Sequence, residues 1–475
     1  MDRLFAHSHR PESIIVTIPS TSRRLESLDA LRGLTIAAML LVNNPGSWSN
    51  IYWPLEHAAW NGWTFTDLIF PFFLFMVGMA MMYSFPKRLE AGTSRLALFG
   101  HVARRAAALM LLGYWGASWS SVLWPGAEST GVMSLVLRLG FVAAAAGVIV
   151  LLAGTERKRL WWSVFGGGAV LFLVGAVSLG FDDSLLARIA ALRVPGVLVR
   201  IAWCYLLASG IYFLTPTRSS IIKWTTGLLA AYMVWMLYVP IPGFGMPNLS
   251  LSFPTSETPA SELFSNWAFY IDYHVLGEHT WGVRQLRDSA GALIWSFDPE
   301  GLISTIPATC SVLLGILAGD WMRRDDKTDP EKLNGLFVAG AWLILAGLLM
   351  SIWMPINKRI WTSSYTVFTG GMAMVTLAIL FHAIDMRGWR KWSFPIVAYG
   401  RNAIFAFVAS GMMAVALGKI RISDNTESGT SLKGFLYESL PGSPEFASFL
   451  FGISFVAVWA IVALFLDKKK IYFKI

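Results

Sequence analysis

Apolar runs recur along the whole chain, and most are as long as a helix needs to cross a lipid bilayer, which is about 20 residues. We identify about twelve such runs. Their approximate centres are Met39, Phe73, Leu111, Ala143, Leu171, Cys204, Ala231, Leu313, Leu343, Met374, Phe405 and Val456. This pattern predicts an all-α polytopic membrane protein, in which residues 1–475 form a single transmembrane domain in the lipid bilayer.

The composition agrees with this class. Of the 475 residues, 55% are hydrophobic and 14% are charged, whereas a soluble domain carries about 25% charged residues. The net charge of +9 fits basic cytoplasmic loops better than nucleic-acid binding, so we expect no nucleic-acid partner. Cys204 and Cys310 both lie in apolar runs, which favours buried small side chains over a disulfide or a metal site.

The distribution of Lys and Arg predicts the topology. Basic residues cluster in alternate links between the apolar runs, and the link that carries His57 has none. We therefore expect both termini in the cytoplasm, with residues 1–27 as a cytoplasmic segment. Residues 239–300 then form a large extracytoplasmic loop on the same side as His57. No cleavable signal peptide is evident, and the first span is expected to act as an uncleaved anchor.

The link after the first span gathers groups suited to proton transfer. His57 lies there, close in sequence to Asn43, Asn44, Glu56 and Asn61, and Asp67 follows just inside the next apolar run. Histidine titrates near neutral pH and is a common acid or base. A histidine at a membrane interface also occurs without any catalytic role, so both interpretations stay open at this point.

Charged residues inside apolar runs are costly and call for a reason. In the first run, Asp29, Arg32 and Asn43 fall on one helical stripe, with Arg32 and Asn43 roughly 16 Å apart along the axis. Such a stripe suits a long polar ligand, or it is an interfacial ion pair followed by a helix cap. Three further arginines are anion-ligand candidates or structural anchors: Arg104, Arg105 and Arg200. His274, Glu278 and His279 show no dependable ligand spacing, so no metal is expected.

Several blocks together resemble the heparan-alpha-glucosaminide N-acetyltransferase family of transmembrane acyltransferases. The first two are SLDALRGLTIAAMLLVN and YWPLEHAAWNGWTFTDLIFPFFLFMVG. They are followed by VPGVLVRIAWCY, YIDYHVLGEHTWG, FDPEGLISTIPA, INKRIWTSSY and YGRNAIFAF. These blocks keep the family order over most of the chain. SLDALRG alone would be a weak signal, because it recurs in other membrane acyltransferases.

The resemblance implies transfer of an acetyl group from cytoplasmic acetyl-CoA to the amino group of a glucosamine-type sugar on the far side of the membrane. The family's active-site histidine falls on His57, its asparagine on Asn43, with Asn44 as a possible substitute, and an arginine on Arg200. We expect His57 to take the amine proton or to carry the acetyl group covalently. Either asparagine would stabilise the oxyanion. Glu56 or Asp67 would orient the imidazole, with Asn61 in support.

We expect acetyl-CoA to bind Arg32, Arg104, Arg105 and Arg200. In the outer loop, we expect Asp272, His279, Asp298 and Glu300 to bind the acceptor. The chain departs from the family at Val199, where many relatives carry glutamine, and in two extra spans around residues 131–181. It also shows no extracytoplasmic N-terminal domain, which suggests a bacterial-type member in the inner membrane. A homodimer is possible within such a family.

Other functions remain as alternatives. The same chemistry could act on a different envelope acceptor, such as a lipid-linked or cell-wall sugar that offers an amine or a hydroxyl. A sugar or lipid transporter would also have many spans, and that class favours inverted repeats and helices broken at the membrane midplane.

Overall fold

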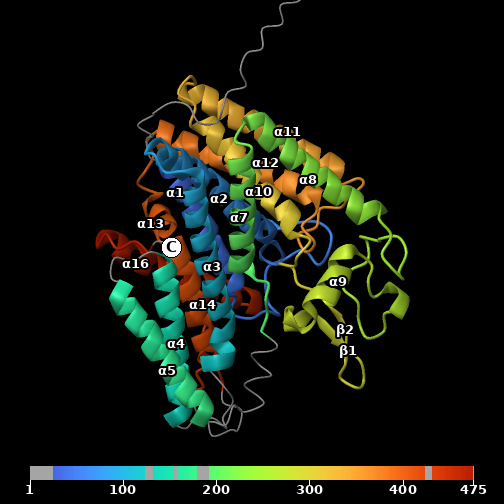
Figure 1. Ribbon diagram of the computed structural model, residues 1–475, viewed down its shortest axis with the longest axis vertical. Helices are drawn as coiled ribbons and strands as arrows, with labels where there is room; N and C mark the ends of the chain where they lie inside the picture. The colour runs from blue at the N-terminus through green and yellow to red at the C-terminus, as the bar shows by residue number, and fades with distance from the viewer. Residues whose placement is uncertain (1–24, 124–131, 154–157, 179–191, 423–429, 474–475) are drawn as a thin grey trace, which may run out of the picture.

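The computed structural model describes residues 25–123, 132–153, 158–178, 192–422 and 430–473 (Figure 1). The predicted cytoplasmic segment 1–27 therefore lies almost wholly outside the described residues. The long helices are α1 (Glu26–Asn43), α2 (Phe65–Glu90), α3 (Arg95–Leu123), α4 (Val132–Ala153), α5 (Lys158–Ser178), α7 (Val197–Leu214), α8 (Arg218–Tyr238), α10 (Thr305–Met322), α11 (Asp329–Met350), α12 (Ser363–Leu380), α14 (Ala403–Lys419) and α16 (Pro444–Lys468). The short helices are α9 (Trp267–Ile271), α13 (Phe394–Arg401) and α15 (Leu432–Glu438).

The all-α polytopic membrane class is confirmed. Within the described residues, ten helices are long and apolar enough to span a membrane, or eleven if the bent pair α13–α14 counts as one. A helix forms at each of the predicted centres. The one predicted span that is not among these eleven is α1, whose 18 residues include three charges, Glu26, Asp29 and Arg32. This charge density is why α1 falls below the apolar character of the other spans.

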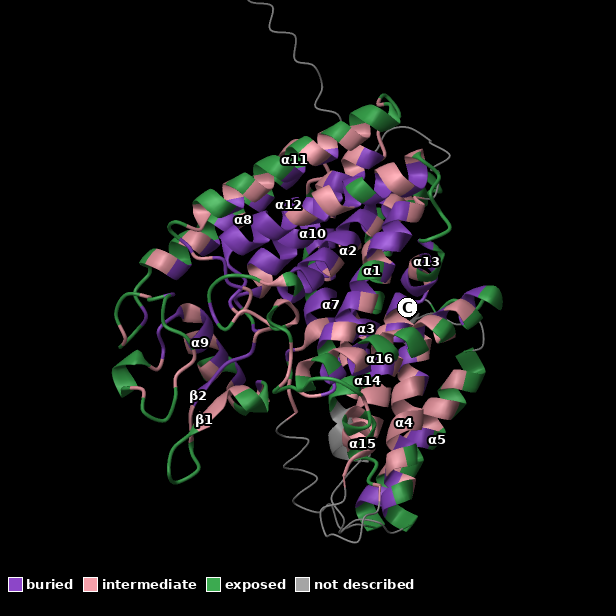
Figure 2. Cartoon of the chain, turned by 180° about the vertical axis from the view of Figure 1, so that it is seen from behind, coloured by how far each residue is buried: buried purple, intermediate pink, exposed green. Residues whose placement is uncertain are grey.

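The centre of the bundle is formed by α1, α2, α7, α10 and α12, whose side chains are mostly buried (Figure 2). Helix α2 runs from the His57 loop to the opposite end of the bundle, a rise of roughly 37 Å for 26 residues. That length matches the thickness of a bilayer. Helix α2 therefore links the His57 loop at one end of the bundle with the opposite end, and any function of the site has to fit this arrangement.

Helices α2 and α10 pack with their backbones in close contact. A Cβ on Gly315 would lie 1.9 Å from the Phe75 carbonyl oxygen, and one on Gly78 would lie 2.0 Å from the Val312 carbonyl oxygen. Small residues of this kind let membrane helices approach closely and gain van der Waals contacts.

Replacing Gly315 by valine is therefore expected to destabilise the bundle by at least about 1–3 kcal/mol, because the side chain has no space at this crossing. Thermal unfolding of the detergent-purified variant measures this loss. Gly227→Val on α8 is the matched control, since a Cβ there meets no atom within 4 Å. Equal melting temperatures for the two variants would contradict the packing argument.

The predicted span centred on Phe405 is interrupted. Helices α13 and α14 meet at Asn402 with a bend of 85°. The break lies beside the N-terminal end of α1, because a Cβ on Gly400 would be 2.0 Å from the Asp29 carbonyl oxygen. Thus α13 packs closely against α1 between Asp29 and Gly33.

Residues 239–304 form a small folded segment at the His57 end of the bundle. It contains α9 and a two-stranded antiparallel sheet, β1 (Gln285–Arg287) and β2 (Leu293–Ser296), in which Leu286 pairs with Trp295. An aromatic cluster of Phe253, Phe269, Trp295 and Phe297 fills its interior. In Figure 1 this segment projects on the side of the bundle opposite to the α4–α5 hairpin.

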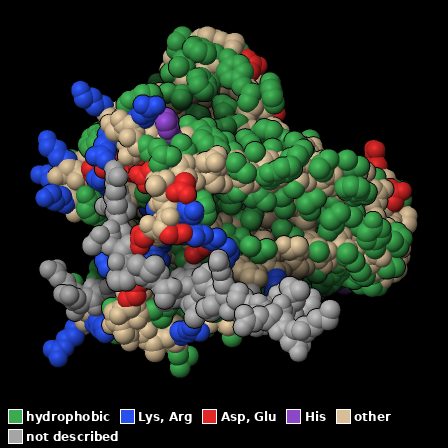
Figure 3. Space-filling view, turned by 90° about the horizontal axis from the view of Figure 1, so that it is seen from above, with side chains coloured by type: hydrophobic (Ala, Val, Ile, Leu, Met, Phe, Trp, Pro, Cys, Tyr) green, Lys and Arg blue, Asp and Glu red, His purple; other side chains and the backbone are tan. Residues whose placement is uncertain are grey.

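The outer surface of the bundle is largely apolar. Figure 3 shows one face covered mainly by hydrophobic side chains, with Lys and Arg gathered toward one side. On α11 the exposed side chains include Val338, Trp342, Leu345, Leu348 and Leu349. Extensive apolar surface of this kind is expected where a protein meets lipid.

Candidate active site

The His57 loop ends in a helix cap that also positions the histidine. Thr64 and Asp67 form a capping box at the start of α2, and the Thr64 amide donates to Asp67 Oδ2 at 3.1 Å. The Ala58 amide donates to the same oxygen at 3.0 Å. The other oxygen, Asp67 Oδ1, lies 2.7 Å from His57 Nδ1. One carboxylate thus contacts the helix start, the loop and the imidazole.

The two partners of this contact differ in burial. The Asp67 side chain is 1% exposed, whereas His57 is 32% exposed. A proton on Nδ1 donates to the carboxylate, which leaves Nε2 as the nitrogen able to accept a proton. This carboxylate–imidazole arrangement is the one that general bases use.

Lys358, in the link between α11 and α12, completes the cluster. Its Nζ lies 3.0 Å from His57 Nδ1 and 3.3 Å from Nε2, and 3.7 Å from Asp67 Oδ1. Its side chain is 16% exposed. The neighbouring Asn357 donates to Asn61 Oδ1 at 3.0 Å, which ties this link to the His57 loop. Asn61 therefore supports the site by holding two loops together.

The electrostatic surroundings favour a neutral imidazole. Burial lowers the pKa of His57 below its usual value, and the positive charge of Lys358 lowers it further, against the opposing effect of Asp67. Burial also lowers the pKa of Lys358 to about 8. At neutral pH, His57 is thus unprotonated and ready to act as a base.

The other polar groups predicted in this loop lie apart from the imidazole. Asn43 ends α1 with an exposed side chain, while the buried Asn44 donates to the Leu40 carbonyl at 2.8 Å. Glu56 is exposed. Within the described residues, none of these three side chains is hydrogen-bonded to His57. Asn43 keeps its predicted role only as a proposal, and the Asn44 amide is already occupied.

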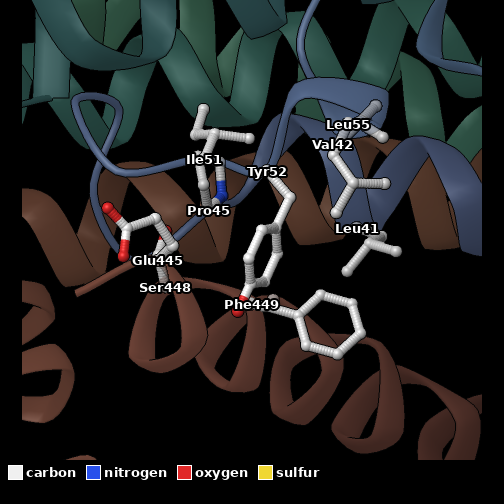
Figure 4. Close-up of a pocket in the computed structure, with 10 residues that line it drawn as sticks. Leu41, Val42, Pro45, Ile51, Tyr52, Leu55, Glu445, Ser448 and Phe449 are labelled. Atoms are coloured by element: carbon white, nitrogen blue, oxygen red, sulfur yellow. The ribbon is translucent and has the colours of Figure 1, made fainter. Parts of the chain in front are cut away.

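A small cleft lies beside this loop, between the end of α1 and the start of α16 (Figure 4). Its lining includes Val42, Tyr52, Leu55 and Phe449, and the Tyr52 and Phe449 rings meet edge to face at 6.1 Å. The cleft holds about 10 Å³, which is the space of a single water molecule. It is too small to accept a substrate in this conformation.

A much larger cavity opens at the other end of α2. It measures about 480 Å³ and is lined by side chains from α1, α2, α3, α7, α13 and α14. Its polar lining is strongly basic and consists of Arg32, Ser84, Arg88, His101, Arg104, Arg105 and Arg401. Three of the four arginines predicted to bind acetyl-CoA thus line one cavity. Such a concentration of guanidinium groups suits phosphate groups.

This basic cavity extends along α2 from Arg88 to Phe73, a distance of about 22 Å. Asp67 lies six residues beyond Phe73, or about 9 Å further along the helix. Apolar side chains fill this interval, where Met39, Val42 and Ile69 pack with Phe73 and Leu55. Helix α2 therefore carries both the wall of the cavity and Asp67, the partner of His57, and the apolar side chains of Met39, Ile69 and Phe73 form a plug between the two.

Arg200 lies elsewhere. On α7, Leu198, Ile201 and Tyr205 face the basic cavity, whereas Arg200 is buried on another face of the helix. Its Nη2 donates to the Gly301 carbonyl at 3.0 Å and to Ser304 Oγ. Its guanidinium carbon lies 5.2 Å from the centre of the Trp361 ring. Arg200 lies on a different side of α7 from the residues that line the cavity, so it does not join the other three arginines. Sequence spacing alone did not show this.

Two of the predicted acceptor ligands lie inside the small folded segment of residues 239–304. Asp272 accepts hydrogen bonds from the backbone amides of Asp298 and Leu302, and burial raises its pKa to about 7. Asp298 forms two 2.7 Å hydrogen bonds with Arg193 and accepts one from the Trp281 amide. Both carboxylates are buried and bound by the chain itself. A sugar would not reach them in this structure, so we do not retain them as acceptor ligands.

The other two lie at the edge of the same network. Glu300 pairs with Arg193, and His279 Nδ1 lies 2.9 Å from the Leu192 carbonyl oxygen. The first contact ties the residues before α7 to those before α10, and the second ties them to the turn that ends at His279. Among the described residues, no three His, Cys, Asp or Glu side chains gather in a way that could hold a metal ion.

The sequence of this chain was compared with those of known proteins. No protein-family model matches the chain. The heparan-alpha-glucosaminide N-acetyltransferase of Mus musculus is 24% identical over 492 aligned residues, which cover 96% of this chain and 61% of the mouse protein. The protein of the same name from Homo sapiens is 24% identical over 488 aligned residues, which cover 95% of this chain and 60% of the human protein. The chain is thus similar over most of its own length to two heparan-alpha-glucosaminide N-acetyltransferases. It spans about three fifths of the length of these two relatives.

Two groups of residues in the candidate site were missed from sequence. Lys358 lies in INKRIWTSSY, a block that matches the family, but nothing local connects it with His57, 301 positions earlier. Arg88 and Arg401 line the basic cavity, yet in the sequence they resemble ordinary basic anchors at span ends. In both cases the signal was present, but only tertiary packing shows which basic residues converge.

Replacing Lys358 by methionine is expected to move the acidic limb of the pH–rate profile to higher pH. The Lys358 charge lowers the pKa of His57, so its removal raises that pKa, and a base must be unprotonated to act. The measurement is kcat/KM for acetyl transfer between about pH 4.5 and 8. Lys327→Met is the control, because Lys327 pairs with Glu331 on the surface. An unmoved acidic limb would show that Lys358 does not set the protonation of His57.

Proposed function

We propose that this chain is a transmembrane acetyltransferase of the bacterial inner membrane. It moves an acetyl group from cytoplasmic acetyl-CoA to the amino group of a glucosamine-type sugar on the extracytoplasmic side. The observation that carries the proposal is the buried Asp67 carboxylate bound to Nδ1 of a partly exposed His57. The two similar proteins are both named heparan-alpha-glucosaminide N-acetyltransferase, which supports it.

The chemistry follows from these groups. A sugar amine attacks the thioester carbonyl only when neutral, and His57 Nε2 takes the proton that the amine loses. The new N–C bond forms as the C–S bond breaks, and the proton then passes to the departing thiolate. The exposed Asn43 amide is our candidate for the hydrogen bond to the oxyanion. The positive charge of Lys358 stabilises the same developing negative charge.

The donor has a place that suits its charge. The nucleotide of acetyl-CoA carries phosphates, and the basic cavity lies at the end of α2 remote from His57. The pantetheine arm would enter along α2 toward Phe73. Delivery of the thioester then requires the plug formed by Met39, Ile69 and Phe73 to open, because its side chains separate the cavity from the histidine.

Two routes share these groups. In one, donor and acceptor are bound together and the amine attacks directly. In the other, His57 accepts the acetyl group first and then passes it on. Labelled acetyl-CoA given without acceptor, followed by rapid quenching, separates the two routes. Label on His57 supports the covalent route, and its absence supports direct transfer.

The test of the function is incubation of the purified chain with acetyl-CoA and a panel of amino sugars, followed by mass spectrometry. We expect an acetylated amino sugar and an equal amount of free CoA. CoA release with a hydroxyl-bearing or lipid-linked acceptor only would move the proposal to that acceptor. Uptake of labelled sugar into vesicles without acetyl-CoA would instead support a transporter.

A further inference from the structure

The residues that follow α16 fold back onto the break between α13 and α14. Lys470 takes a left-handed backbone conformation with a φ of 56°, and the Ile471 amide donates to the Leu466 carbonyl at 2.9 Å. Helices commonly end with this geometry before the chain reverses. The buried Asn402 then holds the reversed segment, because its Nδ2 donates to the Ile471 carbonyl at 3.1 Å and its Oδ1 accepts from the Phe473 amide at 3.0 Å. Hydrogen bonds thus fix the path of the chain as far as Phe473.

Further contacts join this segment to the wall of the basic cavity. Asp467, near the end of α16, accepts hydrogen bonds from Arg401 Nη1 at 2.8 Å and from the Tyr472 hydroxyl at 3.2 Å. The Phe473 ring stacks on Phe405 of α14, with ring centres 4.5 Å apart and planes 12° apart. Both Arg401 and Phe473 line the basic cavity. The segment after α16 therefore forms part of the cavity wall.

The rings of four phenylalanine or tyrosine residues belong to the described lining of this cavity, and they differ in what covers them. Phe85 is buried and stacks on Phe213. Tyr205 is also buried, with a guanidinium 5.6 Å from its ring centre. Phe73 packs in the apolar plug. Phe473 is 48% exposed even though Phe405 covers one face of its ring. Of these four rings, Phe473 offers the most open surface.

An open aromatic ring in a cavity lined by arginines suits a nucleotide. Guanidinium groups bind the phosphates but leave the apolar faces of the base in water. Stacking on an aromatic side chain covers one of those faces, and every base offers such a face. Other exposed phenylalanines have a different setting: Phe465 on α16 is exposed but lies outside the cavity lining.

We propose that Phe473 stacks on the purine base of the acyl donor, so that the segment after α16 gives the cavity its preference for a donor that carries a nucleotide. The proposal rests on the proposed function and names the residue that recognises the base. The base lies on the ring face opposite Phe405. The donor phosphates lie against the arginines of the same cavity, and the pantetheine arm extends toward Phe73.

The experiment measures KM and kcat for three donors, with methyl glucosaminide as the acceptor. Acetyl-CoA carries the base and all phosphates, acetyl-dephospho-CoA lacks only the phosphate on the ribose, and S-acetylphosphopantetheine lacks the whole nucleoside. We expect Phe473→Ala to raise the KM of the first two donors by about tenfold, the usual contribution of one stacked base. The KM of the third donor and kcat for all three should not change, because only binding of the base is lost.

Two further variants separate stacking from simple packing. Phe473→Leu keeps an apolar side chain without the ring, so it should raise the same two KM values as Phe473→Ala does. Phe473→Trp keeps an aromatic face and should retain the wild-type preference among donors. Ile471→Ala is the matched control, because Ile471 is exposed on the same segment but lies outside the cavity lining. Its donor preference should equal that of wild type.

A binding measurement tests the base contact without acetyl transfer. Adenosine 3′,5′-bisphosphate, the nucleotide part of the donor, should displace labelled acetyl-CoA from wild type and should do so about tenfold less well from Phe473→Ala.

The outcomes separate the two proposals. Absence of transfer from every donor in wild type would overturn the proposed function itself. Transfer with KM values that Phe473→Ala and Phe473→Leu leave unchanged would overturn the base contact alone. An equal rise in KM for S-acetylphosphopantetheine would also overturn it, because Phe473 would then only hold the cavity wall in place. Thermal unfolding checks each variant, and Phe473→Leu carries the test if Phe473→Ala does not fold.

Discussion

The His57→Ala variant is expected to lose acetyl transfer by a factor of about 10²–10⁴ in kcat, the usual contribution of a general base. The imidazole is the only group of the Asp67–His57–Lys358 cluster that is neutral and able to accept a proton at pH 7. A covalent role for His57 would make the loss larger still. The measurement is the rate of N-acetyl sugar formation at saturating acetyl-CoA.

Binding of the donor should survive this change, because the basic cavity ends about 9 Å from Asp67 along α2. Equilibrium binding of labelled acetyl-CoA to His57→Ala checks this directly. His274→Ala is the matched control: His274 also lies at the outer end, but its Nδ1 contacts the Tyr270 carbonyl and its ring lies against Tyr270. A His57→Ala variant that transfers acetyl at the wild-type rate would end the assignment.

The fold followed from sequence wherever one local property decided the outcome. Apolar length placed the helices, and the Thr64–Asp67 spacing is the pattern of a helix cap. Two spans depart from the simple pattern. Helix α1 carries three charges, and the chain bends by 85° at Asn402, where α13 packs closely against α1.

The candidate site could be predicted only in part from the sequence, for a similar reason. Asp67 is ten residues from His57, so its role could be anticipated from one loop. Lys358 comes from a link 301 residues away, and its approach depends on how α12 packs against α2. From residue type alone, Asp298, which is buried and bound to an arginine of the same chain, could not be distinguished from an exposed aspartate that binds substrate. Burial depends on the fold.

The basic cavity gives the second large expected effect. Replacing Arg104 and Arg105 together by glutamine should raise the KM for acetyl-CoA by about 10²-fold, since each guanidinium–phosphate contact is worth about 1.5–3 kcal/mol. The value of kcat should change little, because both side chains lie at the end of the cavity remote from His57. Both arginines belong to α3, so the change removes two charges without touching the histidine loop.

A truncated donor makes this test specific for the nucleotide. S-acetylpantetheine lacks the nucleotide phosphates, so wild type should use it with a much higher KM than acetyl-CoA, and the double variant should use the two donors about equally. Arg95→Gln is the control on the same helix, because Arg95 donates to the Phe213 carbonyl and lies outside the cavity lining. If the double variant still preferred acetyl-CoA as strongly as wild type does, the phosphates would bind elsewhere. The donor would then have to reach His57 by a route other than the one along α2.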